Sequence, residues 1–340
     1  MILITGAGGF IGGHLCKHFI DKNIRVRAVD VKPLNEWYQV HSQCENKILD
    51  LKSYDNCFIS LEGVDHVYNL ACDMGGMGFI ENNKALCMFS VLINTNLLLS
   101  IKNYNLLNQS RKINRYFYSS SACVYNATKQ TKSNVTALKE EDAYPALPED
   151  GYGWEKLFSE RMCQNYMEDF GLECRVARFH NVYGPLGTYD GGREKAPAAI
   201  CRKIIEAENT GNKEIEVWGD GLQTRSFMYI DDCITGILKI MESDVRVPIN
   251  LGSDELVSIN QLIDYTSEIA DYHVNKKYII DAPKGVRGRN SDNEFILKQL
   301  SWKPSINLRE GLKITYEWIK SQMDGRSEQR VAFIRGGNAG

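Results

Sequence analysis

The sequence contains few of the features that would place the protein in a membrane or outside the cell. None of its apolar runs approaches the roughly 20 residues that a helix needs to span a bilayer. The first residues enter an apolar stretch at once, without the charged segment that opens a cleaved signal sequence. We therefore expect a cytoplasmic protein without a membrane partner.

Cysteine and histidine lack the spacings that metal sites and disulfide frameworks need. The chain has 10 cysteines but no Cys-x-x-Cys pair, and its 6 histidines show no ligand spacing. Because the cysteines are scattered through apolar segments, we expect reduced thiols that mostly fill the core, and no metal ion.

An excess of charge of one sign is also missing. A net charge of −3 at pH 7 gives no general attraction to nucleic acid or to an anionic membrane, so neither is expected as a partner. The 340 residues are 43% hydrophobic and 24% charged, which is typical of a globular protein with a large core. A chain of this length allows about two domains.

The first motif is a glycine-rich turn between an apolar strand and an amphipathic helix. Residues 1–5 form the strand, Gly6, Gly9 and Gly12 follow it, and the helix continues to about residue 20. These glycines permit a tight turn, close approach of a pyrophosphate, and packing of the helix on the strand. Because the N-terminus of the helix also offers N–H donors to phosphate, the motif predicts a dinucleotide site.

An acidic residue at the end of the next strand bears on the choice of dinucleotide. Asp30 follows residues 25–29, and its carboxylate can accept hydrogen bonds from both ribose hydroxyls and would repel a 2′-phosphate. This favours NAD over NADP, and Lys32 is the one neighbour that argues the other way. Asp50 follows a further short strand and could meet the adenine. The candidate cofactor contacts are Gly6, Gly9, Phe10, Ile11, Gly12, Asp30, Asp50, Leu51, Ala71, Tyr152 and Lys156.

Strands and helices keep alternating through the first half of the chain. Such alternation indicates an α/β fold with a Rossmann-type, doubly wound parallel sheet and ligands at the carboxyl ends of its strands. We expect residues 1–180 to form the NAD-binding domain, with some later segments returning to it, residues 181–322 mainly a smaller substrate domain, and residues 323–340 a frayed tail. The remaining expected strands are residues 47–51, 64–71, 115–119, 172–179 and about 215–217, and the expected long helices are residues 82–107 and 152–169.

Two irregular stretches interrupt this alternation. Residues 73–79 follow a strand end and contain Gly75, Gly76 and Gly78, which let the backbone approach a ligand closely. Residues 126–150 are rich in Lys, Thr, Glu and Pro, which predicts a solvated excursion from the fold.

Ser121, Tyr152 and Lys156 could form a proton-transfer unit beside a nicotinamide. Tyr152 and Lys156 are four residues apart and so share one face of a helix, while Ser121 ends a neighbouring strand. An unperturbed tyrosine has a pKa of about 10, so it needs a neighbouring ammonium and a positive nicotinamide to favour the phenolate. Cys123, two residues beyond Ser121, would by itself more often be a buried, inert thiol than a catalyst.

Together these motifs resemble one protein family. The glycine motif and the set of Ser121, Tyr152 and Lys156 resemble the extended short-chain dehydrogenase/reductases and, among them, the NAD-dependent epimerase/dehydratase family. The similarity runs from residue 1 to about 322. Six loops are similar to those of the GDP-mannose 3,5-epimerases within that family, namely residues 71–79, 120–123, 178–185, 192–199, 218–226 and 285–293.

The resemblance implies an isomerase that uses NAD transiently. Hydride would leave carbon 4 of the mannosyl ring of GDP-mannose while Tyr152 takes the hydroxyl proton, and the resulting ketone acidifies the hydrogens on carbons 3 and 5. Proton carriers matching Cys123 and Lys195 would then invert these centres towards GDP-L-galactose, or towards GDP-L-gulose after a single inversion, before the ring is reduced again. The resemblance assigns the sugar to Gly75, Gly76, Gly78, Ser121, Cys123, Asn181, Glu194 and Lys195, and the GDP to Lys203, Gln223, Arg287 and Arg289.

Other readings stay open at the level of the sequence. A relative that inverts one centre of another GDP-hexose or a GDP-heptose would use the same residues. A non-catalytic NAD-binding regulator would keep the fold, but it has no need of Cys123 and Lys195 in addition to the Tyr152–Lys156 pair. A dehydratase is disfavoured because it needs an acidic residue where this chain has the thiol of Cys123. The resemblance also implies a homodimer, built through the two long helices of the first domain.

Overall fold

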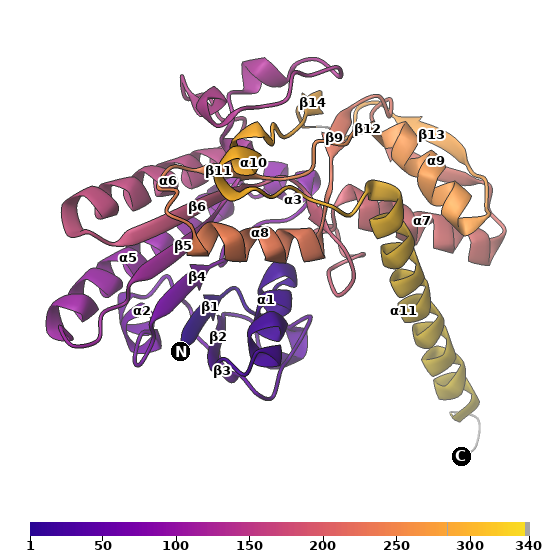
Figure 1. The fold of residues 1–340 in the computed structure, drawn as a ribbon. Helices are drawn as coiled ribbons and strands as arrows, with labels where there is room; N and C mark the ends of the chain where they lie inside the picture. The colour runs from indigo at the N-terminus through magenta and orange to yellow at the C-terminus, as the bar shows by residue number, and fades with distance from the viewer. Residues whose placement is uncertain (284, 337–340) are drawn as a thin grey trace.

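The structure, a computed structural model, describes residues 1–283 and 285–336, with side chains up to residue 325. Its centre is a seven-stranded parallel sheet with the order β11-β6-β5-β4-β1-β2-β3 (Figure 1). The order reverses between β1 and β4, so the predicted Rossmann-type, doubly wound sheet is confirmed. Its strands are β1 (Ile2–Thr5), β2 (Val26–Asp30), β3 (Glu45–Ile48), β4 (His66–Asn69), β5 (Arg115–Ser121), β6 (Glu173–Phe179) and β11 (Ile249–Leu251).

Helices cover both faces of this sheet, because successive side chains of a strand point to opposite sides. On β5, Phe117 belongs to one core cluster, and Tyr116 and Tyr118 belong to another; all three side chains are buried. The first cluster includes side chains of α1 (Phe10–Asp21) and α8 (Ile230–Glu242), and the second includes those of α2 (Tyr54–Ser60), α5 (Ser90–Leu107) and α6 (Gly151–Phe170).

The single long helix predicted for residues 82–107 is wrong in its detail. Asn83 leaves helical geometry, with φ −132° and ψ 40°, and separates two helices. A further break precedes Ser90. The chain therefore forms α3 (Met77–Asn82), α4 (Lys84–Met88) and α5.

The segment Lys84–Leu107 is long and apolar enough, by length and composition alone, to cross a membrane, which the sequence analysis did not expect. A core helix passes the same test, so the finding is weak evidence for a membrane. Here 39% of the apolar window is buried inside the structure. Leu97, Leu98 and Ile101 are completely buried in the core cluster that α5 shares with α2 and α6.

The C-terminal part adds three smaller sheets. The prediction that residues 215–217 complete the main sheet is wrong, because β8 pairs with β13 and the seventh position beside β6 belongs to β11. Side chains along β8 are alternately exposed and buried, so only one of its faces is covered, whereas β1 and β2 are buried on both. The small sheets are β8 (Glu214–Trp218) with β13 (Asn275–Ile279), β9 (Thr224–Ser226) between β12 (Leu256–Ser258) and β14 (Gly288–Arg289), and β7 (Val182–Tyr183) with β10 (Met228–Tyr229).

The helices α7 (Ala196–Thr210), α9 (Ile259–Ala270) and α11 (Leu308–Gly336) pack against one another in this part of the molecule. A short helix, α10 (Glu294–Leu300), packs beside β11. The predicted frayed tail over residues 323–340 is wrong as far as Gly336, because α11 continues to that residue and extends beyond the body of the molecule in Figure 1. Residues 337–340 lie outside the described part.

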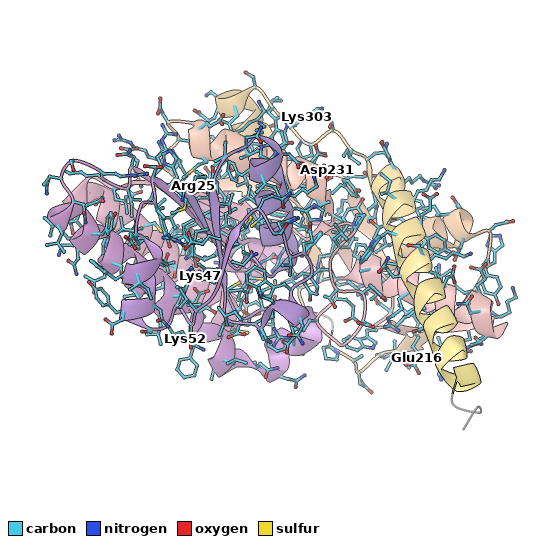
Figure 2. The ribbon with its side chains drawn as sticks, turned by 90° about the horizontal axis from the view of Figure 1, so that it is seen from below. Arg25, Lys47, Lys52, Glu216, Asp231 and Lys303 are labelled. Carbon is cyan, nitrogen blue, oxygen red and sulfur yellow. The ribbon has the colours of Figure 1, made fainter. Side chains whose placement is uncertain are left out.

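Charged side chains are distributed over the whole surface. Figure 2 labels the basic Arg25, Lys47 and Lys52 and the acidic Glu216 and Asp231 on different elements of the fold. All five are exposed to solvent. The two signs are interspersed, as the small net charge leads one to expect.

Candidate active site

The predicted site residues follow the carboxyl ends of β1, β2, β4, β5 and β6. The glycine-rich turn leaves β1, Asp30 ends β2, Ala71 follows β4, and Ser121 ends β5. Because the main sheet is parallel throughout, these ends meet at one edge. The predicted cofactor residues Gly6, Asp30 and Ala71 and the substrate candidate Ser121 thus lie at one edge of the sheet.

The turn between β1 and α1 is packed as a dinucleotide site requires. Gly6 has a φ of +67°, and a Cβ on Gly12 would lie 2.2 Å from the carbonyl oxygen of Gly6, so neither position accepts a larger residue. The N-cap of α1 is Gly9, which has no side chain to occupy the free N–H groups of the first turn. These groups fit a pyrophosphate, and Phe10 and Ile11 form that turn.

The remaining cofactor candidates lie around this turn. Asp30 accepts hydrogen bonds from the backbone N–H groups of Gly8 (3.0 Å) and Lys32 (3.1 Å). The Lys32 ammonium donates to the Gly8 carbonyl (2.9 Å), so its charge is tied to the turn. Asp50 is exposed just beyond β3, and Leu51 beside it is buried.

Tyr152 and Lys156 lie together in the first turns of α6, both buried. The Lys156 ammonium lies 5.6 Å from the centroid of the Tyr152 ring and donates to the Ser119 carbonyl (3.0 Å). Burial lowers the pKa of Lys156, but the neighbouring Cys72 and Glu155 outweigh it, so the net direction is upward. Lys156 is therefore a fixed positive charge beneath the phenol.

The pKa of Tyr152 is raised well above its usual range. Burial is the largest cause, Cys72, Cys123 and Glu155 add to it, and a hydrogen bond with Ser121 works against it. The sequence analysis expected the neighbouring ammonium to favour phenolate, whereas desolvation dominates in the folded protein. Tyr152 therefore holds its proton strongly, and its phenolate is a strong base.

Cys123 and Lys195 come from distant parts of the chain and lie near enough for the thiol to influence the pKa of the amine. Cys123 lies in a short turn directly after β5, and Lys195 is the N-cap of α7. Burial lowers the pKa of Lys195, the electrostatic influence of Cys123 raises it, and that of Arg289 lowers it. The Lys195 ammonium donates to the Gly75 carbonyl (3.2 Å).

The glycine-rich loop of residues 73–79 packs against the loop that carries Lys195. A Cβ on Gly76 would lie 2.6 Å from the carbonyl oxygen of Glu194, and the Gly76 N–H donates to the Arg193 carbonyl (3.0 Å). A Cβ on Gly75 would meet the Cβ of Phe79 at 2.8 Å and its ring at 3.0 Å, and one on Gly78 would meet Trp218 at 3.3 Å. These glycines therefore allow the two loops to lie against each other.

The residues predicted to hold GDP form two groups. Lys203, Gln223 and Arg287 each contact the segment of residues 216–220: Lys203 donates to the Glu216 carbonyl (2.7 Å), Gln223 to the Trp218 carbonyl (2.8 Å), and Arg287 pairs with Asp220 (2.8 Å). Arg289 lies apart from them, beside Cys123. The two remaining sugar candidates are Asn181, which donates to the Ser226 carbonyl (3.1 Å), and Glu194, which accepts from the Gly192 N–H (2.7 Å) and pairs with Arg202.

Comparison with known proteins shows the family to which the chain belongs. The sequence pattern of the NAD dependent epimerase/dehydratase family matches residues 2–252. The chain belongs to this family. Its cofactor is NAD, as the sequence predicted.

Curated members of the NAD-dependent epimerase/dehydratase family include close relatives of this chain. GDP-mannose 3,5-epimerase 1 of Oryza sativa subsp. japonica is 48% identical over 333 residues, covering 97% of this chain and 84% of that protein. GDP-mannose 3,5-epimerase of Arabidopsis thaliana is 47% identical over 326 residues, covering 95% and 83%. The structure of UDP-glucose 4-epimerase from Thermotoga maritima shares the fold, with a TM-score of 0.83 at 22% identity, covering 95% of this chain and 99% of that one. The resemblance to the GDP-mannose 3,5-epimerases is confirmed.

Several residues of this epimerase-family site were missed in the sequence analysis. Arg225 lies close enough to Arg289 and Cys123 for each to influence it, and burial, the largest cause, lowers its pKa to about 10. Glu149 pairs with Arg289 at 3.5 Å. Cys72 forms a hydrogen bond with Tyr152. Arg225 and Cys72 each stand inside one of the similar loops, which was the available signal, but Glu149 had none.

The segment of residues 126–150 is in part the solvated excursion that its composition predicted, since Lys129, Lys132 and Asn134 are exposed, but other residues of it are buried. Gln130, Leu138 and Ala143 are at most 1% exposed. Leu138 pairs with Ser291, and the Arg287 N–H donates to the Gln130 carbonyl (3.0 Å). Polar residues are buried here because hydrogen bonds satisfy them, and the segment forms a wall of the site.

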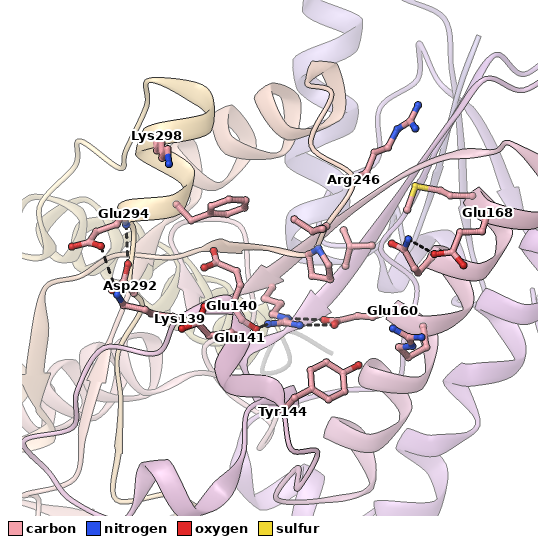
Figure 3. A pocket seen from close by; sticks show the side chains of 18 residues that line it. Lys139, Glu140, Glu141, Tyr144, Glu160, Glu168, Arg246, Asp292, Glu294 and Lys298 are labelled. Atoms are coloured by element: carbon pink, nitrogen blue, oxygen red, sulfur yellow. Dashed lines mark hydrogen bonds and ion pairs between the residues drawn. The ribbon is translucent and has the colours of Figure 1, made fainter.

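The cavity of about 660 Å³ in Figure 3 lies away from this site, beside α6 and β11. Its lining includes Glu140, Arg246, Asp292 and the buried ion pair between Arg178 and Glu160 (2.8 Å), but none of the predicted site residues. Among the described residues, no group of three or more His, Cys, Asp or Glu could hold a metal ion.

Proposed function

We propose that the protein converts GDP-D-mannose to GDP-L-galactose by inverting carbons 3 and 5, with GDP-L-gulose as the product of a single inversion. One observation supports the proposal: Cys123 packs in one cluster with Tyr152 and lies near enough to Lys195 to influence its pKa. A simple dehydrogenase needs only the Tyr152–Lys156 pair. The names of the relatives from Oryza sativa and Arabidopsis thaliana support the choice of substrate.

Tyr152 and Lys156 serve the redox half of the reaction. NAD, when bound, accepts the hydride of carbon 4 and later returns it. Tyr152 takes the proton of the 4-hydroxyl in the first half and gives it back in the second. Its raised pKa favours taking the proton, and the buried charge of Lys156 stabilises the phenolate that is present before the first transfer and formed again in the second.

Cys123 and Lys195 serve the inversion of carbons 3 and 5. Both hydrogens are acidic while carbon 4 is a ketone, and each inversion needs a base on one ring face and an acid on the other. Because burial lowers the pKa of Lys195, a larger share of its amine is neutral and able to accept a proton. We assign Cys123 and Lys195 to the two ring faces.

Deuterium exchange tests the proposal directly. The purified protein with NAD is incubated with GDP-mannose in heavy water, and the sugar is followed by NMR. Label at carbons 3 and 5 is expected from the wild type, and none from Cys123→Ala, which should still bind NAD. Cys44→Ala, at a thiol before β3, is the matched control and should exchange normally.

The contrary outcomes are distinct. Label at one carbon would identify a single-centre epimerase. Bound NAD without any label would favour the regulator or another sugar. Exchange at the normal rate in Cys123→Ala would remove Cys123 from the reaction.

We also infer a cytoplasmic homodimer. All ten cysteines are free, which suits a reducing compartment. Helices α5 and α6 expose large apolar side chains, including Leu106 and Leu107 on α5 and Trp154, Phe158 and Phe170 on α6. A second copy of this chain would cover them.

A further inference from the structure

The Arg289 guanidinium is held from three directions. Its Nε donates to the Gln130 side-chain oxygen (2.6 Å), its Nη1 donates to the Cys123 sulfur (3.4 Å), and its Nη2 lies 3.5 Å from a Glu149 oxygen. Arg289 is 7% exposed. The contact with sulfur depends on the direction in which this planar group is fixed.

Gln130 is oriented by its own hydrogen bonds. Its side-chain nitrogen donates to the backbone carbonyls of Tyr125 (3.3 Å) and Asn126 (3.4 Å). These two acceptors determine which end of the amide is nitrogen, so the oxygen faces Arg289. With 1% exposure, Gln130 has no room to turn away.

Arg289 needs such a support because a second guanidinium lies near it. The electrostatic influence of Arg289 helps to lower the pKa of Arg225, which shows that the two positive groups repel each other. A carboxylate in place of Gln130 would also hold Nε, but it would neutralise part of the charge that faces the sulfur. An amide fixes the direction and leaves the positive charge intact.

We propose that Gln130 is a positioning residue that holds the Arg289 guanidinium against Cys123, where the positive charge stabilises the thiolate formed during proton transfer. The inference rests on the proposed function for its role in catalysis. Its physical content concerns the reactivity of one thiol, which can be measured without any substrate.

The first test is alkylation of the NAD-loaded protein by iodoacetamide, with the rate at Cys123 read by peptide mass spectrometry. Because the thiolate is the reactive form, loss of the supporting charge slows alkylation. Gln130→Met keeps the side-chain volume and removes the acceptor oxygen. We expect the rate to fall about tenfold, the size of effect typical for a charge-assisted hydrogen bond, and to match that of Arg289→Met.

Two further variants separate positioning from simple packing. Gln130→Glu restores an acceptor oxygen at the same length, so positioning predicts a rate between those of the wild type and Gln130→Met. A merely structural role predicts the opposite order, because Met fills the space whereas Glu buries a charge. Lys129→Ala, which removes the neighbouring exposed ion pair with Asp142, is the control and should alkylate at the wild-type rate.

The outcomes distinguish this inference from the proposed function. A wild-type rate in Gln130→Met, or a slower rate in Gln130→Glu than in Gln130→Met, overturns the positioning role. In heavy water, Gln130→Met should also slow deuterium exchange into GDP-mannose about tenfold with NAD binding unchanged. If the wild type itself incorporates no deuterium, the proposed function fails, while the alkylation result still decides the role of Gln130.

Discussion

At the scale of single residues, buried polar side chains join the catalytic strand to the wall formed by residues 126–150. His180, just after β6, makes a hydrogen bond with the Asn250 side-chain oxygen (2.9 Å), which also accepts from the Tyr125 hydroxyl. The Asn250 amide donates in turn to the Leu138 carbonyl (2.8 Å). His180 therefore donates through Nε2 to Asn250 in this network.

Burial of His180 makes the stability of the protein depend on pH. Desolvation, opposed in part by Asn250, lowers the pKa of His180 to about 3, whereas an unfolded histidine titrates near 6.5. Between these values the unfolded chain binds a proton that the folded protein does not, so the free energy of unfolding falls as the pH is lowered. From pH 7 to pH 5 the loss through His180 should be about 2 kcal/mol.

Urea denaturation of the wild type and of His180→Gln measures this contribution. Gln keeps a donor for Asn250 but does not titrate, so its pH dependence should be weaker than that of the wild type by the same amount. Burial also lowers the pKa values of His14, His18 and His66, but these act in both proteins. If the free energy of unfolding depends on pH equally in the wild type and in His180→Gln, the prediction is wrong.

At the scale of elements, the contact between the glycine-rich loop and the Lys195 loop sets a second prediction. A side chain at position 76 meets the rigid backbone oxygen of Glu194 at 2.6 Å, whereas one at position 78 meets the edge of the Trp218 ring at 3.3 Å. Gly76→Ala should therefore displace Lys195 and lower kcat more than tenfold, with NAD affinity unchanged. Gly78→Ala should lower it less than threefold.

Steady-state kinetics with GDP-mannose measures kcat of the two variants, and NAD titration measures their affinity for the cofactor. Equal effects would show that the loop tolerates both methyl groups and that its contact with residues 193–194 does not fix Lys195.

The elements also show how far a sequence can be interpreted. The alternation of strands and helices predicts the parallel sheet, and the spacing of the glycine motif predicts its cofactor edge. Residues 214–218 have the pattern of a strand, but the pattern does not indicate with which strand they pair. The partner strand β13 begins at residue 275, which is 57 residues after the end of β8 at residue 218. The strand β11, which pairs with the outer edge of β6, has only three residues and is too short to be recognised from the sequence.

The site was predictable where a motif carries chemistry and unpredictable where it depends on contacts. Tyr152 and Lys156 stand in a recognisable helical motif, and Cys123 and Lys195 stand in recognisable loops. Gln130 stands in a polar segment, and its burial follows from hydrogen bonds to groups that are distant in sequence. The composition of the segment indicates that burying a polar residue there is unfavourable. It does not indicate the hydrogen-bond partners that compensate for the lost contact with water.

At the scale of the whole molecule, the exposed apolar face of α5 and α6 predicts a dimer. Phe158 on this face is 54% exposed. A charge there would be buried and unpaired in a dimer, so Phe158→Asp should shift the protein to monomer in analytical ultracentrifugation. Ile280→Asp, at an apolar residue of 53% exposure after β13, is the matched control and should leave the dimer intact. A monomeric wild type would refute the assignment of this face.

The architecture also predicts that residues 1–180 do not fold alone. This fragment lacks β11 and α8, whose Ile230, Cys233 and Ile237 are completely buried in the core cluster of the main sheet. Without them one face of the sheet and the edge of β6 are exposed, so the fragment should aggregate or lack a cooperative unfolding transition. A soluble fragment that unfolds cooperatively and binds NAD would contradict this.

The edge position of β11 also affects how the chain is made on the ribosome. Strand β6 ends at residue 179, and its neighbour begins at residue 249. At a synthesis rate of about 5–20 residues per second, the residues between them take roughly 3–14 s to make. Throughout that interval the nascent chain presents an unpaired strand edge that other chains can join.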